Sequence, residues 1–95
     1  MSKFTEQQRM TLRIVLAKCV ELEGSTPLTP YCLMQEYAST DEAKFQRIVN
    51  ALTEAKCLSK TSDLGLSWYN VTAYGLAVHN RIREQMWQSK HPDLA

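Results

Sequence analysis

Apolar residues recur at helical spacing over the first quarter of the chain. The segment from about Thr5 to Glu23 fits one helix, because Thr5 with Gln8 three residues later forms a capping-box pattern and Gly24 follows the end. The apolar positions cover a wide part of its circumference: Met10, Leu12, Ile14, Val15, Leu16, Ala17, Cys19 and Leu22. A helix with so broad an apolar surface is buried on more than one side. In a chain of 95 residues, we expect the second side to meet another subunit.

Two further helices are predicted before the pattern changes. Thr29 stands as an N-cap with Pro30 at the first helical position, which predicts a short helix from Pro30 to Tyr37. Ser39 and Glu42 form a second capping-box pattern, so a third helix is expected over about 40–56. This helix has the clearest period in the chain, with one apolar face made by Phe45, Ile48, Val49, Leu52 and Ala55.

Short segments with strand-favouring residues follow the third helix. Residues 58–62 and 66–71 flank Asp63-Leu64-Gly65, which predicts a β-hairpin with its turn at these three residues. Thr72 then caps a fourth helix that runs to about Trp87, and residues 88–95 are expected to form a flexible tail. The sequence therefore predicts a single domain over 1–95. Its fold class is mainly α with a small β-hairpin (α+β), in the order helix, helix, helix, strand, strand, helix.

Two stretches resemble a known family. The segment 41–58 resembles the recognition helix of the MarR and PadR regulators and its exit into the wing. The segment 69–76 is similar to their second wing strand and to the threonine-x-x-glycine that opens their next helix. The resemblance implies a winged helix-turn-helix fold and a DNA-binding transcriptional regulator, most often a repressor of bacterial, phage or plasmid type. It also implies that the helix over about 40–56 enters the major groove and that the hairpin over 58–71 is the wing.

The polar residues of these two elements suit contact with DNA. Arginine can bind guanine through O6 and N7, whereas glutamine and asparagine can bind adenine through N6 and N7. Residues near helix starts and on the wing can contact phosphates, which positions a protein without reading sequence. The candidate DNA-binding residues are Lys44, Gln46, Arg47, Asn50, Lys60, Ser62, Thr40 and Tyr31. A polar outer face is equally typical of any amphipathic helix, so the pattern alone leaves both interpretations open.

The charge of the chain argues for two copies on DNA. The formal net charge is only +1, and Asp41 and Glu42 lie at the start of the third helix, where they would repel phosphate. Affinity for DNA depends strongly on phosphate neutralisation, so one copy would bind weakly. We therefore expect a homodimer on a palindromic site. The first and fourth helices would form its interface through Leu12, Leu16, Cys19, Val78, Ile82, Met86 and Trp87.

Other chemistry finds little support in the composition. Cys19, Cys32 and Cys57 are widely spaced, without a C-x-x-C pair, and the chain carries neither a phosphate-binding loop nor a nucleophile motif. We expect no cofactor, no metal and no enzymatic activity. No long apolar stretch or signal-like N-terminus is present, so a cytoplasmic protein without membrane contact is expected. The alternative function is a winged-helix module that binds another protein and not DNA, and a small-molecule effector is left open.

Overall fold

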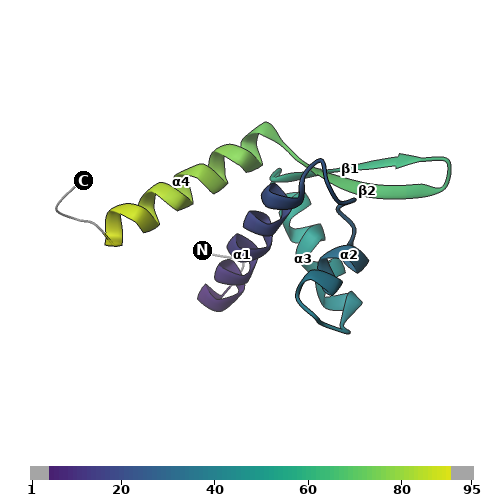
Figure 1. Cartoon of the computed structure of the whole chain (residues 1–95), viewed down its shortest axis with the longest axis horizontal. Helices are drawn as coiled ribbons and strands as arrows, with labels where there is room; N and C mark the ends of the chain where they lie inside the picture. Colours follow the sequence, from purple (N-terminus) through teal and green to yellow (C-terminus); the bar gives the residue numbers. More distant parts are fainter. Residues whose placement is uncertain (1–4, 91–95) are drawn as a thin grey trace.

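The computed structural model describes the backbone of residues 5–90 and the side chains as far as residue 85. Over this range the chain forms four helices and one antiparallel two-stranded sheet, in the predicted order (Figure 1). The elements are α1 (Glu6–Leu22), α2 (Pro30–Glu36), α3 (Glu42–Glu54), β1 (Leu58–Asp63), β2 (Leu66–Val71) and α4 (Ala73–Lys90). The predicted mainly helical α+β layout is confirmed. The hairpin and α4 leave the three-helix body in opposite directions (Figure 1).

Side-chain caps begin the first three helices. Thr5 and Gln8 form the predicted reciprocal capping box on α1, and the Thr29 hydroxyl accepts from the Cys32 N–H at the start of α2. The predicted Ser39–Glu42 capping box is wrong. Asp41 is the N-cap of α3, and its carboxylate accepts from the Lys44 N–H at 3.0 Å. Because the Ser39 hydroxyl accepts from the N–H of residue 41, it serves the turn before the helix, which begins two residues later than expected.

The hairpin closes through a two-residue turn. Leu64 and Gly65 both have positive φ, at 50° and 79°, as a turn that matches the twist of the two strands requires. Asp63 pairs with Leu66 and so belongs to β1, where the sequence had predicted a turn residue. On the other edge of β2, the Tyr69 N–H donates to the Leu28 carbonyl at 2.8 Å. This bridge ties the loop between α1 and α2 to the base of the hairpin.

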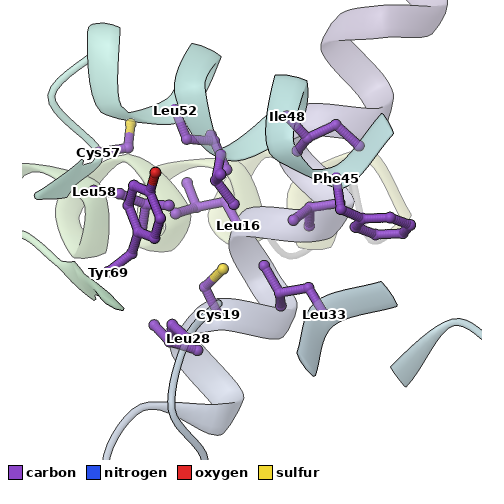
Figure 2. Close-up of a cluster of buried hydrophobic side chains, with 12 residues drawn as sticks. Leu16, Cys19, Leu28, Leu33, Phe45, Ile48, Leu52, Cys57, Leu58 and Tyr69 are labelled. Carbon is purple, nitrogen blue, oxygen red and sulfur yellow. The ribbon is translucent and has the colours of Figure 1, made fainter. Parts of the chain in front are cut away.

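One hydrophobic core joins the three-helix body to the hairpin (Figure 2). The predicted apolar face of α3 supplies four of its members, and α1 supplies three. No buried polar or charged residue occurs in the part of the chain whose side chains are described. The core consists of Val15, Leu16, Cys19, Leu28, Leu33, Phe45, Ile48, Val49, Leu52, Cys57, Leu58 and Tyr69.

A compact junction connects the end of α3 to the start of α4. Lys56 has φ 68°, and the N–H of Cys57 donates to the Leu52 carbonyl, so α3 ends in a Schellman motif with a lysine at its left-handed position. The Thr72 hydroxyl donates to the Lys56 carbonyl and accepts from the Gly75 N–H. A Cβ on Gly75 would clash with the Cys57 carbonyl oxygen. The threonine-x-x-glycine pattern therefore has a physical cause: threonine joins the two helix ends, and only glycine fits against the exit of α3.

The fourth helix is longer than predicted. It continues through Lys90, so residues 88–90 are helical where a flexible tail was expected, and residues 91–95 lie outside the described range. Its packing against the body is mainly with α1. In the described part of the chain, no helix combines the length and the apolar character needed to cross a bilayer.

Candidate nucleic-acid interface

The outward face of α3 is the centre of the candidate interface. Because Phe45, Ile48, Val49 and Leu52 turn one face of α3 into the core, the opposite face is left to solvent. Residues turn by about 100° each along a helix, which places positions 46, 47 and 50 on that outer face. Gln46, Arg47 and Asn50 are all exposed. These three predicted residues therefore lie together on the solvent-exposed side of α3.

Gln46 and Asn50 form a hydrogen-bonded pair, which we call the amide pair. They are one helical turn apart, and the Gln46 Nε2 donates to the Asn50 Oδ1 at 2.9 Å. The Gln46 Nε2 also lies 3.4 Å from the Tyr69 hydroxyl, to which it donates. Tyr69 comes from β2, and Figure 2 shows its hydroxyl pointing toward α3. The amide pair is thus held from the hairpin side as well as within α3.

The hairpin continues this surface away from α3. Lys60 pairs with Tyr69 and Ser62 pairs with Ser67, and directly paired residues of an antiparallel ladder lie on the same face. Tyr69 turns toward α3, so the predicted wing residues Lys60 and Ser62 lie on the α3 side of the hairpin. Both are exposed, and the Ser62 and Ser67 hydroxyls are hydrogen-bonded at 3.0 Å. Tyr69 therefore contacts Gln46 of the amide pair and lies on the same face of the hairpin as Lys60 and Ser62.

The predicted basic residues of α3 lie nearer to α1. Lys44 and Arg47, which we call the basic pair, line an open hollow of about 500 Å³ together with Gln7, Gln8 and Thr11 of α1. The Lys44 ammonium also lies 6.0 Å from the centre of the Phe45 ring, within the range of a cation–π contact. The outer surface of α3 is therefore divided into a basic flank beside α1 and an amide flank beside the hairpin.

The last two predicted DNA contacts are not part of these two flanks. Tyr31 is half-exposed on α2, where its hydroxyl accepts from the Gln35 amide at 3.1 Å. Thr40 is exposed in the turn between α2 and α3, just before the N-cap. Tyr69 was missing from the sequence-based set. Its position directly opposite Lys60 in the predicted hairpin is the signal by which it could have been included.

The residues predicted to form a dimer interface fall into three groups. Leu16 and Cys19 are 2% and 0% exposed, because their side chains lie in the hydrophobic core of this chain. The prediction that these two residues form a dimer interface is therefore wrong. Leu12, Val78 and Ile82 are half-buried, and the first two pack against the edge of the core. Met86 and Trp87 belong to the part of α4 whose side chains lie outside the described residues.

Two of the three cysteines, Cys19 and Cys57, are buried in the hydrophobic core. Burial raises the pKa of the Cys19 thiol to about 12, with a smaller contribution from the Glu23 carboxylate, and burial also raises the pKa of Cys57. Both thiols therefore stay protonated at neutral pH. Among the described residues, no group of three or more His, Cys, Asp or Glu side chains is arranged to hold a metal ion.

Together these observations describe the candidate interface. A helix with an exposed polar flank lies between a basic hollow and a projecting hairpin, on a small body with a hydrophobic core. In comparisons with known proteins, no family model, no curated protein and no solved structure matches this chain.

Proposed function

We propose that this chain is a winged helix-turn-helix protein that binds duplex DNA and regulates transcription as a homodimer in the cytoplasm. In this proposal α3 enters the major groove, and the hairpin of β1 and β2 acts as the wing. The observation that carries the proposal is the outward face of α3, where Arg47 and the amide pair are exposed together, with Lys60 exposed on the face of the hairpin that carries Tyr69. Arginine and carboxamide side chains are those that read base edges in the major groove.

The order of the elements and the two family-like segments add support. A helix-turn-helix protein presents the second helix of its motif to the groove, and α3 follows α2 after a short turn, as that arrangement requires. The resemblance of segments 41–58 and 69–76 to the MarR and PadR regulators favours the same orientation. The Thr72–Gly75 junction gives the second of these segments a structural role in joining the wing to α4.

The low charge makes two copies part of the proposal. Each chain has a formal net charge of +1, so phosphate neutralisation by one copy is small. Two copies on a palindromic site double the contacts, and such half-sites lie about one helical turn of DNA apart. The half-buried Leu12 and Ile82 are candidates for the contact between copies.

Fluorescence anisotropy with a random-sequence duplex tests this function. We expect salt-sensitive binding that weakens steeply between about 50 mM and 200 mM salt, with two chains per bound duplex. Replacing the basic pair, Lys44→Ala with Arg47→Ala, should abolish binding because it removes both α3 cations from the interface. The matched control is Arg81→Ala with Arg83→Ala, which removes the same charge from exposed positions of α4. Equal loss in both double variants, or a monomer by light scattering at tens of micromolar, contradicts the proposal.

A second candidate is a winged-helix module that binds another protein. It is favoured by the tip of the hairpin, where Leu64 and Leu66 are 93% and 67% exposed beside the acidic Asp63. Such a tip does not suit a phosphate backbone. If no duplex binds at low salt, this candidate is preferred.

A further inference from the structure

We infer that the amide pair is an adenine-reading element and that the Tyr69 hydroxyl, reaching across from the hairpin, sets its orientation. This inference rests on the proposed DNA binding and adds the base that the site prefers. The starting observation is that Gln46 has two hydrogen-bond partners, Asn50 on its own helix and Tyr69 on β2. A glutamine on an exposed helix face normally samples several rotamers, so two partners restrict it before any ligand arrives.

The hydrogen-bonding groups that remain define a complementary base. The Gln46 Nε2 uses its two hydrogens on Asn50 and Tyr69, which leaves the Gln46 Oε1 as an acceptor and the Asn50 Nδ2 as a donor. Neither atom has another partner among the described residues. If both amides are turned over, the tyrosine hydroxyl donates instead, and the pair again offers one donor and one acceptor. The combination is therefore a property of the pair and not of one orientation.

Adenine is the base that matches this combination in the major groove. It presents an acceptor at N7 and a donor at N6, whereas guanine presents two acceptors, at N7 and O6. The exposed amide flank has one donor for N7 and one acceptor for N6, so guanine would leave an acceptor facing an acceptor. Arg47, one residue from Gln46, has the chemistry for guanine and lies on the other flank. The surface is therefore expected to read an adenine on the hairpin side of α3 in each half-site.

Tyr69 is a positioning residue in this scheme. Its side chain is 5% exposed, so its ring belongs to the core and its hydroxyl reaches Gln46 without taking part in the outer surface. Tyr69→Phe keeps the ring and removes the hydroxyl. A purely structural role for Tyr69 would alter stability but not the preference for one base over another.

The experiment first uses the whole chain to select duplexes from a pool with a randomised centre. It then measures the affinity of the chain for the selected duplex and for the same duplex in which the selected adenine is replaced by guanine. For the unaltered chain we expect a preference for adenine on the order of tenfold at one position per half-site. Gln46→Met and Asn50→Ala should remove that preference, and Tyr69→Phe should reduce it several-fold, while affinity for the unselected pool changes little. Gln85→Met on α4 is the matched control and should leave the preference intact.

The outcomes separate this inference from the proposed function. Binding of selected duplexes with no adenine position, or with an adenine preference that survives in Gln46→Met and Asn50→Ala, overturns the inference and leaves DNA binding standing. Failure of the unaltered chain to retain any duplex at low salt overturns both.

Discussion

Helices α3 and α4 flank the hairpin in the chain, but they pack against the rest of the molecule in different ways. α3 turns four side chains into the core, Phe45, Ile48, Val49 and Leu52. Within the part of α4 whose side chains are described, only Gly75 is buried, and Val78, His79 and Ile82 are half-buried. α3 is therefore fixed along its length by hydrophobic packing, whereas α4 is held at its first turn, by Thr72 and Gly75 against the exit of α3, and by a half-buried contact with α1.

This difference shows two ways in which a short chain positions a helix. Packing along a whole face holds α3 rigidly and leaves its outer face available for a ligand. The junction with α3 and the contact with α1 leave most side chains of α4 exposed as far as residue 85, and the helix extends away from the hairpin (Figure 1). In the proposed function, the first arrangement keeps the polar side chains of α3 in register with DNA, and the second leaves α4 exposed to a second copy.

The largest expected effect comes from deleting the same side chain in each helix. Leu52→Ala on α3 should lower the free energy of unfolding by about 2–5 kcal/mol, because residue 52 is 4% exposed and its loss leaves a cavity. Leu76→Ala on α4, where the side chain is 45% exposed, should cost less than about 1 kcal/mol. Urea denaturation followed by circular dichroism measures both. Equal losses would remove the contrast between the two helices.

An intermediate effect is expected at the junction. Gly75→Ala should destabilise the chain by about 1–3 kcal/mol, although alanine favours helices, because the new Cβ meets the Cys57 carbonyl oxygen. Asn80→Ala also places an alanine in α4, by removing an exposed carboxamide, and should be neutral or slightly stabilising because alanine has the higher helix propensity. Thermal unfolding distinguishes the two. A stabilised Gly75→Ala variant would show that α4 does not approach the exit of α3 so closely.

The smallest expected effect has the opposite sign. Lys56→Gly should stabilise the chain by about 0.5–1 kcal/mol, because residue 56 has positive φ, which costs a lysine more than a glycine. Lys56→Ala removes the same charge but keeps a Cβ in the left-handed conformation, so it should bring no such gain. If both variants shift the urea midpoint equally, the effect arises from charge and not from the backbone at the end of α3.

The candidate site was only partly predictable from sequence. The period of α3 correctly placed Lys44, Arg47 and Asn50 on an exposed face, since helical spacing alone separates them from the apolar positions. Spacing did not show that Lys44 and Arg47 flank α1 while Gln46 faces the hairpin, because that division depends on which neighbour lies on each side of α3. Tyr69 was missed for the same reason: its partner Gln46 is 23 residues away in the chain.

Local signals in the chain were sufficient for the order of elements, the caps at Thr5 and Thr29, and the buried face of α3, because each depends on residues within a turn or two of one another. Tertiary structure alone decided that Leu16 and Cys19 lie inside this chain's own core. It also decided why residue 75 is glycine, through a carbonyl oxygen that arrives from the end of another helix. A sequence pattern shows that a side chain is apolar or polar, but which neighbour it meets is settled only when distant segments pack together.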